Sequence, residues 1–585
     1  MSTPASRSAP TADGTFTHRQ ILTIISGLLL GMFLAALDQT VVSTAIRTIA
    51  DDLQGYDLQA WATTSFLITS TIATPLYGKL SDLFGRRPFY LLAIGVFVVG
   101  SALCSIAWSM YSLAAFRAVQ GIGAGGLLSL AFTILGDLVP PRERSKYQAY
   151  FMAVFASSSV LGPVVGGLLA GADSIAGLTG WRWIFLVNVP LGAVAFVVVA
   201  RVLRIPHVRR PHRIDWPGAV ALAVFLVPLL IVAEQGREWG WTSSGALVCY
   251  VVGAVGLVAF ITAEARYGDE ALLPLSLFGN RTYGVGVTSS LIVGMGMFGG
   301  LLLLPQYLQV VRGSSPTVAG FQMLPLVLGI MTASAISGVL TSRTGRYKIF
   351  PMIGTALMTI ALLLFSRIGA DTPLPLVMLV MLVFGMGLGG NMQSVILAVQ
   401  NAVDPRSMGV ATSAVTFFRQ IGGTLGTAVF LSVLFSTLGG RIGSAFSDAA
   451  QDPEFQAALA ANPDQAAQLQ QATAGGLAST EAFTSLDPVL AQPFRVGFTD
   501  SLDAIFLIGA AILAVGFVVT LFLPELPLRT MSGVQAQAAG AGAVGEGPAG
   551  STSDAGPAAQ ATAPAAATFA PPGSIDQTVP EPDRR

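Results

Sequence analysis

Two charged side chains stand inside long apolar stretches near the start of the chain, and they are the first candidates for chemistry. Asp38 lies in the apolar run 20–46 and Arg117 in the run 111–136. A charge inside a bilayer is costly, so such residues usually face a cavity, pair with an opposite charge or take part in proton movement. If the two runs cross the membrane in opposite directions, each charge lies roughly 9 to 12 Å from the same end, at 1.5 Å per residue. The pair could couple proton or substrate movement, or it could be a static ion pair that fastens two helices.

A compact charged segment, Gly-Lys-Leu-Ser-Asp-Leu-Phe-Gly-Arg-Arg, separates two further apolar stretches. Its Gly78 and Gly85 are expected to permit a tight turn between helices, while Arg86 and Arg87 hold the membrane surface. Asp82 can pair with such an arginine or cap a helix N-terminus, where it meets a partial positive charge. The segment could thus be a contact that breaks and re-forms, or a loop whose cations only fix the orientation of the chain.

A weaker copy of this segment occurs in the second part of the chain, at 338–347. The dipeptide Pro141-Arg142 likewise returns as Pro405-Arg406. Recurrence at a large spacing predicts two duplicated halves. The copy has Ser342 where the first segment has Asp82, so we expect the first segment to be the working contact.

Small residues and a proline are concentrated in the apolar run 147–171, at Gly162, Pro163, Gly166 and Gly167. Small residues one turn apart let helices approach closely, and a proline removes a backbone donor and bends the helix. The glycines could equally serve packing alone, because membrane helices often carry them for that purpose.

A further intramembrane cation is expected in the second half. Arg419 lies in the apolar run 408–436, where it could contact a substrate or form a buried structural bond. No metal site is predicted, because the histidines His18, His207 and His212 lie outside the apolar runs and have no ligand-spaced partners. No nucleophile with a base and no carboxylate pair converge, so we do not expect an enzyme.

Composition fixes the class of protein. The chain has 585 residues, of which 53% are hydrophobic and 11% charged, and its formal net charge is zero. A mean hydropathy of +0.69 is far above that of soluble domains. The absence of a basic face argues against a nucleic-acid partner. The sequence therefore predicts an all-α polytopic membrane protein that is embedded in the lipid bilayer.

A spanning helix needs about 20 apolar residues, and on that rule the chain has fourteen candidate spans. Their approximate limits are 20–46, 58–77, 88–108, 111–136, 147–171, 183–203, 215–234, 244–264, 283–307, 316–340, 349–367, 374–398, 408–436 and 501–523. The repeat matches six spans with six, so the seventh and eighth are interpreted as an inserted pair between two pseudo-symmetric bundles.

This division predicts the organisation of the whole chain. The expected parts are an N-terminal tail 1–19, a six-helix bundle 20–203, a basic linker with two inserted helices 204–280, a second six-helix bundle 281–523 that includes an acidic outer loop 437–500, and a disordered tail 524–585. The outer loop is expected to be a solvated spacer, although a short helix in its Ala/Gln-rich middle, or a surface that docks an extracytoplasmic partner, is the alternative.

The distribution of cations predicts the orientation. Lys79, Lys146 and Lys348 follow even-numbered spans, as do most arginines of the loops. Those connections and both termini are therefore expected on the cytoplasmic side of the membrane. We expect this membrane to be the plasma membrane of a bacterium.

Several of these motifs resemble those of a known family. Residues 78–87 resemble the signature loop between the second and third helices of the major facilitator superfamily, and 338–346 resemble its second-half echo. Residues 117–123, Arg-Ala-Val-Gln-Gly-Ile-Gly, are similar to its fourth-helix motif, and 162–167 to the fifth-helix motif of antiporters. Leu-Asp-Gln-Thr-Val-Val at 37–42 is similar to the first-helix motif of the fourteen-helix drug:proton antiporters of the EmrB/QacA branch.

The resemblance implies the major facilitator fold and an exporter of apolar or cationic drugs that works by alternating access. It links Asp38 and Arg117 to proton coupling, Asp82 and Arg86 to gating, and the glycines of the fifth helix to packing that limits leak. The sequence has no Gly-x-x-x-x-Gly-Lys-Ser/Thr loop for ATP, which favours a proton gradient as the energy source and no cofactor. Two alternatives stay open: export of an endogenous lipid, siderophore or antibiotic, and a membrane anchor or sensor that does not transport.

Overall fold

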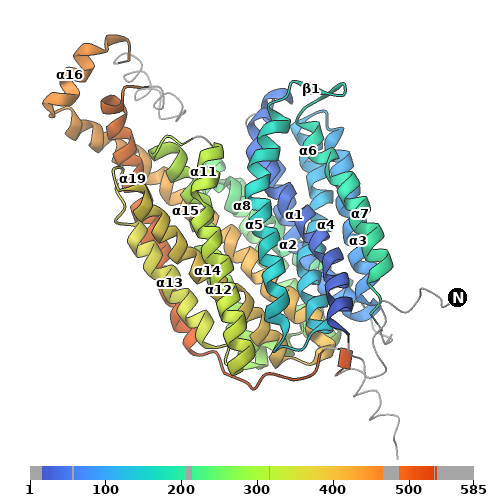
Figure 1. Cartoon of the computed structure of the whole chain (residues 1–585). Coiled ribbons are helices and arrows are strands. Elements are labelled where there is room, and N and C mark those ends of the chain that lie inside the picture. Colours follow the sequence, from blue (N-terminus) through green and yellow to red (C-terminus); the bar gives the residue numbers. More distant parts are fainter. Residues whose placement is uncertain are drawn as a thin grey trace, which may run out of the picture. The chain divides into compact units, whose positions relative to one another are not determined.

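The structure is a computed structural model. Long helices make up most of it, as the apolar runs predict (Figure 1). It describes residues 16–55, 58–205, 214–314, 316–465, 486–532 and 534–535. All of these belong to one unit, Met1–Ala539. The predicted tails up to residue 15 and beyond residue 535, the stretch 206–213 of the basic linker and the stretch 466–485 of the outer loop lie outside the described residues.

The first half carries Asp38, Arg117 and the charged segment. Local signals set the helix ends: Thr17 and Ser109 each begin a helix with a capping box, and Gly85, at a φ of 98°, separates two others. The helices are α1 (His18–Asp52), α2 (Gln59–Phe84), α3 (Arg86–Ser105), α4 (Met110–Leu138), α5 (Arg144–Ala170), α6 (Arg182–Leu186) and α7 (Asn188–Val202). Two short antiparallel strands, β1 (Ser174–Ile175) and β2 (Leu178–Thr179), precede α6.

The rest of the chain begins with two helices capped by the side chains of Asp215 and Ser243. These are α8 (Trp216–Trp239) and α9 (Ser244–Tyr267). The second half then comprises α10 (Arg281–Gln306), α11 (Pro316–Gln322), α12 (Leu324–Thr344), α13 (Ile349–Phe365), α14 (Leu374–Ala402), α15 (Met408–Ala449), α16 (Pro453–Ala461) and α19 (Pro488–Leu521). Short 3-10 or π-helical turns lie at Gly268–Glu270, Leu275–Gly279, Tyr307–Val311 and Pro405–Ser407.

The helix pairings of the first half recur in the second. Helix α1 packs on α5 and α7 as α10 packs on α15 and α19. The pairs α2–α4, α3–α4 and α3–α7 likewise correspond to α12–α14, α13–α14 and α13–α19. This correspondence agrees with the duplication predicted from the repeated charged segment.

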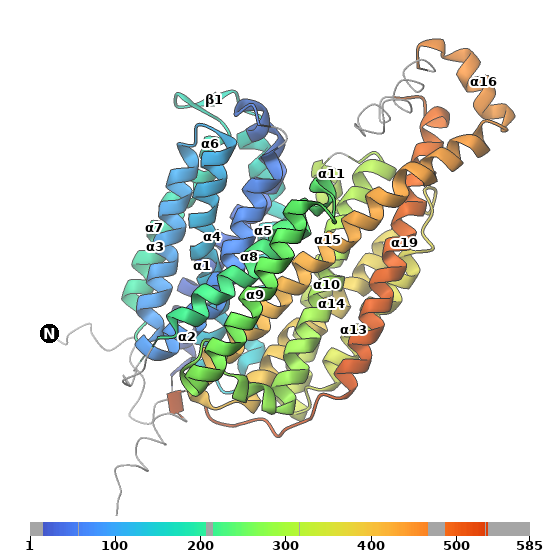
Figure 2. The same cartoon turned by 180° about the vertical axis from the view of Figure 1, so that it is seen from behind.

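Two seams join the halves. Helix α2 packs on α15 along one seam, and α5 packs on α12 along the other. The additional pair α8–α9 follows the first seam, because α8 contacts both α2 and α15 (Figure 2). The inserted helices thus lie beside a contact between the halves.

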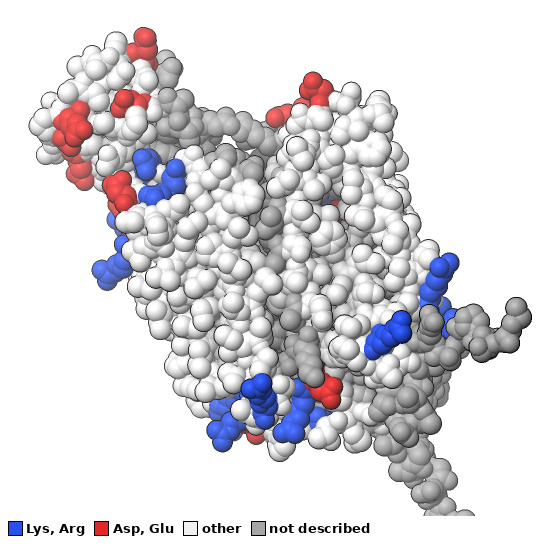
Figure 3. Space-filling model, viewed as in Figure 1, with Lys and Arg blue, Asp and Glu red and all other residues white. Residues whose placement is uncertain are grey.

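The structure confirms a largely helical membrane protein but leaves the number of crossings a prediction. A helix lies at each of the fourteen expected positions. Eleven helices of the described residues are long and apolar enough to cross a membrane, and Ile349–Phe365 is apolar but shorter. On the face shown in Figure 3, charged side chains gather toward two ends and leave a broad uncharged band between them, as a bilayer-facing surface requires.

The helices next to the predicted outer loop are longer than expected. Helix α15 continues past the expected end at 436 to Ala449, and α19 begins at Pro488 rather than near 501. Between them, α16 buries Phe455 against Phe446, with ring centroids 6.3 Å apart. This part of the loop is therefore structured, where a solvated spacer was the favoured expectation, because its apolar side chains have partners.

The beginning of the expected disordered tail is also ordered. Residues 523–532, which we call the strap, follow α19 and run along the helix ends. The Tyr347 hydroxyl donates to the carbonyl oxygen of Pro524 (3.3 Å) and accepts from the amide of Leu526 (2.9 Å). The amide group of Asn401 bonds to Pro527 and Arg529 in the same way, at 3.0 Å each. Composition alone could not reveal these bonds, because their partners lie far away in the sequence.

The bonds of Tyr347 give a prediction for the strap. Because a hydrogen bond contributes about 1 kcal/mol, we expect Tyr347→Phe to speed amide hydrogen exchange at Leu526 by about fivefold to tenfold. Exchange in detergent or nanodiscs, read by mass spectrometry, measures it. Tyr90→Phe is the matched control, because Tyr90 bonds to Leu28 within the first half and should leave the strap unaffected. Unchanged protection in Tyr347→Phe would show that these bonds do not hold the strap.

Candidate functional site

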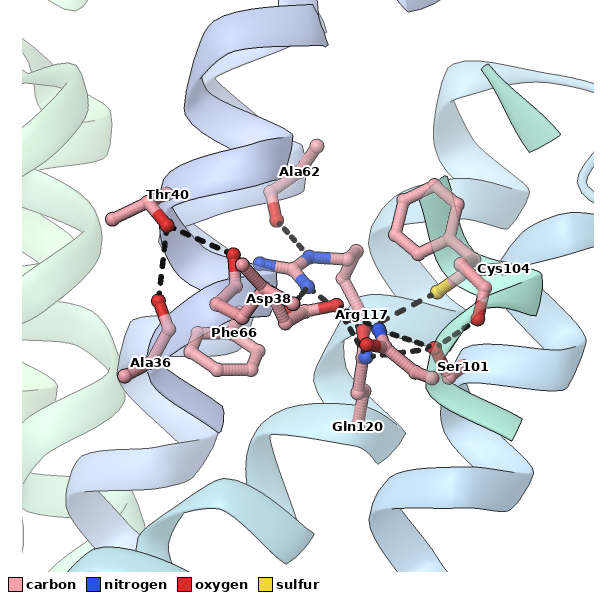
Figure 4. Close-up of polar contacts among 12 residues, drawn as sticks. Ala36, Asp38, Thr40, Ala62, Phe66, Ser101, Cys104, Arg117 and Gln120 are labelled. Atoms are coloured by element: carbon pink, nitrogen blue, oxygen red, sulfur yellow. Dashed lines mark hydrogen bonds and ion pairs between the residues drawn. The ribbon is translucent and has the colours of Figure 1, made fainter. Parts of the chain in front are cut away.

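Asp38 and Arg117 meet inside the first half (Figure 4). Helix α1 supplies Asp38 and α4 supplies Arg117, and the carboxylate oxygen Oδ2 lies 2.6 Å from Nη1 of the guanidinium. Each residue is 1% exposed. The sequence placed the two charges at one depth but could not show that they touch.

Neutral side chains complete the surroundings of the pair. The other carboxylate oxygen of Asp38 accepts from the amides of Gln120 (2.9 Å) and Asn188 (2.7 Å). Both amides also donate to the hydroxyl of Ser101, at 3.1 and 3.0 Å. Gln120 lies one turn after Arg117 in the fourth-helix motif, which is a signal that could have identified it, whereas Asn188 and Ser101 stand in no such motif.

Arg117 is held on every side. Its Nε donates to the carbonyl oxygen of Ala62 on α2 at 3.1 Å, and its Nη1 donates to Gln120 at 2.8 Å. The guanidinium carbon lies 4.2 Å from the ring centroid of Phe66, a cation–π distance. The network therefore joins α1, α2, α3, α4 and α7. Protonation of Asp38 would remove the charge that orients Arg117, so this arrangement can connect proton binding to helix contacts.

A second charged cluster lies where α2 meets α3, which we call the Gly85 end. Arg86 forms ion pairs with Asp82 and with Asp137 of α4, the latter at 2.6 Å. Its Nη1 also donates to the hydroxyl of Ser81 at 2.7 Å. The cluster is buried, so each charge depends on the others. Asp137 was not identified from the sequence, because it ends a helix outside the segment.

Asp82 joins the two halves. Its carboxylate accepts from the backbone amides of Gly409 (3.1 Å) and Val410 (2.9 Å) at the N-terminus of α15. The sequence offered two uses for this carboxylate, pairing with an arginine and capping a helix, and the structure shows both at once. The capped helix belongs to the other half of the chain, which no local pattern could indicate.

Gly78 lies inside a helix and not in the expected turn. Gly85 does form the turn, but Gly78 lies inside α2, where a side chain would collide with Ser413 and with the carbonyl of Gly409 on α15. It permits close approach of the halves rather than a turn. Arg87 is exposed and donates to the carbonyl of Ala200 on α7, which leaves it at the surface as expected.

A second bridge between the halves lies beside this cluster. Arg144 of α5 is buried and donates to Gln400 of α14 and, at 2.7 Å, to the carbonyl of Gly136. The amide of Gln400 in turn donates to Thr412 on α15 at 2.8 Å. In the repeated segment, by contrast, the Ser342 hydroxyl donates to Val339 within its own helix. The asymmetry expected from the replacement of aspartate by serine is thus visible in the contacts.

The glycines of the fifth helix divide into two groups. Gly162 and Gly166 lie against α1, next to Thr40 and Val41, where a side chain would collide. Gly167 is exposed and has open space around its Cα. Helix α5 continues through Pro163 from Arg144 to Ala170. Close packing of α1 on α5 therefore accounts for two of these glycines.

Arg419 is buried within α15. Among the described residues it forms neither a hydrogen bond nor an ion pair, so the structure does not bring it to any of the other charged residues predicted from the sequence.

The sequence pattern of the Major Facilitator Superfamily matches residues 28–427. The chain belongs to the Major Facilitator Superfamily. Multidrug resistance protein 3 of Bacillus subtilis is 36% identical over 436 residues, which cover 74% of this chain and 84% of that protein. The multidrug transporter protein MdtP of the same organism is 33% identical over 529 residues, which cover 88% and 95%.

The fold of the superfamily is confirmed by a solved structure. The proton:xylose symporter XylE superposes with a TM-score of 0.55, covering 89% of this chain and all of that one, at 16% identity. At that identity the similarity concerns the arrangement of helices alone. Because the chain belongs to the Major Facilitator Superfamily, it is a membrane transporter and not an enzyme.

The buried pair gives a prediction for stability. Replacing one partner leaves the other charge uncompensated, so we expect Arg117→Gln to lower the free energy of unfolding by about 3 kcal/mol or more. The double variant Asp38→Asn with Arg117→Gln should lose less than the sum of the two single changes, because both charges are then removed. Denaturant unfolding of the purified protein in detergent measures all three. Arg343→Gln, at an exposed position, is the control. If the stability lost in the double variant equalled the sum of the losses in the two single variants, the pairing would be contradicted.

Proposed function

We propose that this transporter exports small, largely apolar molecules in exchange for protons, with Asp38 as the proton-carrying group. The supporting observation is the network around Asp38, in which one buried carboxylate is bonded to three side chains from two other helices, Arg117 and Gln120 of α4 and Asn188 of α7. Protonation of this carboxylate weakens its bonds to Arg117 and Asn188 together. A single proton can thereby change contacts across the whole first half.

The Gly85 end supports a mechanism of alternating access. Asp82 and Arg144 connect the halves at this end through polar contacts, which can break without exposing large apolar surfaces. We propose that these contacts close one end of the pathway and that their release opens it. Gly78 permits the close approach that this closure needs.

We further propose that the Gly85 end faces the cytoplasm of a bacterial cell and that the chain lies in the plasma membrane with both termini inside. The cation-rich connections support this orientation. The names of the two Bacillus relatives, a multidrug resistance protein and a multidrug transporter, support drug-like substrates. The energy comes from the proton gradient, without a cofactor.

The role of Asp38 is tested by Asp38→Asn. Asparagine keeps the shape and can bond to Arg117 but cannot carry a proton, so we expect substrate-dependent proton release from energised inside-out vesicles to fall to the level of vesicles without the protein. Insertion should be unchanged, because the helices remain apolar. Asp448→Asn, at an exposed position on α15, is the matched control. Wild-type proton movement in Asp38→Asn would assign coupling to another group.

The role of Asp82 is tested by Asp82→Ala. A carboxylate at a partly buried helix N-terminus contributes about 1 to 2 kcal/mol, so its loss should shift the equilibrium toward separated halves by about tenfold. Spin labels at Phe84 and Arg406, in a background without Cys104 and Cys249, measure the separation. Maximal transport should slow while the apparent affinity for substrate changes little.

The repeated segment supplies the control for this experiment. Ser342→Ala alters the equivalent position but no contact between the halves, so its distance distribution should match that of the wild type. A change of substrate affinity in Asp82→Ala without a change of distances would count against the gating role.

A further inference from the structure

The preceding proposal gives no role to Arg419, the intramembrane cation that the sequence predicts in the second half. Arg419 is 9% exposed, and its side chain forms neither a hydrogen bond nor an ion pair with the described residues. Arg86, Arg117 and Arg144 are buried too, but each is bonded to several groups. The buried side-chain atoms that lack a partner in the described residues include no nitrogen of Arg419, so its guanidinium has accessible surface at which an acceptor from outside the chain can bind.

The depth of Arg419 agrees with a place on the transport pathway. Helix α15 begins with Met408 at the Gly85 end, and Arg419 lies about 16 Å further along the axis at 1.5 Å per residue. A hydrocarbon core is about 30 Å thick, so this position is near its middle. Substrate sites of such transporters are expected at this level, between the two halves.

Arg419 is also on the inner side of α15. Thr412 precedes it by two helical turns and therefore lies on nearly the same face. That face meets the other half of the chain: Thr412 is bonded to Gln400, which also donates to the carbonyl of Phe132 on α4, and Met408 lies against Gly136 of α4. The guanidinium thus extends from the face that the two halves share.

A second unpartnered polar group lies at the same level. Gln393 precedes Gln400 by two turns of α14, so both amides lie on one face. Gln393 lies nine residues before the end of α14 at Ala402, and Arg419 lies eleven residues after the start of α15 at Met408, so the two residues have similar heights in antiparallel helices. The bond between Gln400 and Thr412 shows that these faces of α14 and α15 are turned toward each other at that end. Gln393 is 3% exposed, and neither its amide nitrogen nor its carbonyl oxygen has a hydrogen-bond partner.

The described carboxylates do not compensate this positive charge. Asp38 is bonded to Arg117, and Asp82 and Asp137 are bonded to Arg86. The inner face of the second half therefore presents a cation and an amide, both of which can donate, and would repel a positively charged molecule.

We propose that Arg419 and Gln393 form a binding subsite for the acidic group of the exported molecule, which we assign to the class of apolar organic carboxylates. The guanidinium can donate two parallel hydrogen bonds to a carboxylate, and the Gln393 amide can donate a third. Ligand pockets in proteins are lined mostly by apolar side chains, which suits an apolar remainder of the molecule. This assignment rests on the proposed export function and narrows its substrates from small, largely apolar molecules to apolar acids.

The test compares three ligands that share one apolar skeleton: 4-biphenylcarboxylate, 4-biphenylmethanol and 4-biphenylmethylammonium. Their dissociation constants are measured by quenching of tryptophan fluorescence on the purified full chain in nanodiscs, without any proton gradient. A charge-assisted hydrogen-bond pair is worth about tenfold or more in affinity. We expect the carboxylate to bind wild type about tenfold more tightly than the ammonium compound.

Variants separate the subsite from general packing. Arg419→Gln should weaken carboxylate binding about tenfold and leave the alcohol within about twofold, since only the acidic group uses the guanidinium. Gln393→Leu should weaken the carboxylate by a smaller factor. Arg419→Lys keeps the charge but loses the paired geometry, so it should fall between wild type and Arg419→Gln, and it carries the test if the glutamine variant does not fold. Arg343→Gln, exposed on α12, is the control.

The outcomes are distinct from those for proton coupling. Coupling is read as proton release in Asp38→Asn vesicles, whereas the subsite is read as equilibrium binding to wild type and to the Arg419 variants without a proton gradient, so either proposal can fail while the other stands. Absence of carboxylate binding to wild type, tightest binding of the ammonium compound, or equal losses for all three ligands in Arg419→Gln would each overturn the assignment.

Discussion

A charge buried among apolar helices must have a partner, and this constraint organises the chain. The pair Asp38–Arg117 satisfies it within the first half, together with amides from neighbouring helices. The cluster of Asp82, Arg86 and Asp137 satisfies it at the Gly85 end. Because surroundings of low dielectric constant penalise an unpaired charge, we expect the partners of each cluster to stay together or to exchange for other partners at the same time. That property suits a protein whose helices must exchange one set of neighbours for another.

The two halves share a plan of helix packing but not a plan of charges. The pairings around α1 to α7 recur around α10 to α19, as duplication requires. The second segment has Ser342 where the first has Asp82. Asp82 accepts from the N-terminus of α15, whereas among the described residues Ser342 bonds only within its own helix and so forms no corresponding bridge between the halves. The two seams therefore have similar helix packing but differ in the polar contacts made at these positions.

The sequence predicted those features that depend on position along a helix. Apolar length located the helices, and residue counting placed Asp38 and Arg117 at one depth, because an α-helix converts sequence distance into height. Counting does not fix which helices are neighbours, so Asn188, Asp137 and Gln400 were missed although they bond to the central charges. These partners come from distant parts of the chain. Gly78 was placed in a turn for a related reason, since a glycine needed for close packing and one needed for a turn look alike in sequence.

The helices α8 and α9 give the two seams different surroundings. Helix α8 lies along α2 and α15, and α9 packs on α8, whereas the described residues offer no inserted pair along α5 and α12. A compound dissolved in the lipid would therefore meet a wider protein barrier on one side than on the other. In the export that we propose, a solute that enters sideways from the bilayer would therefore have fewer helices to pass on the α5–α12 side.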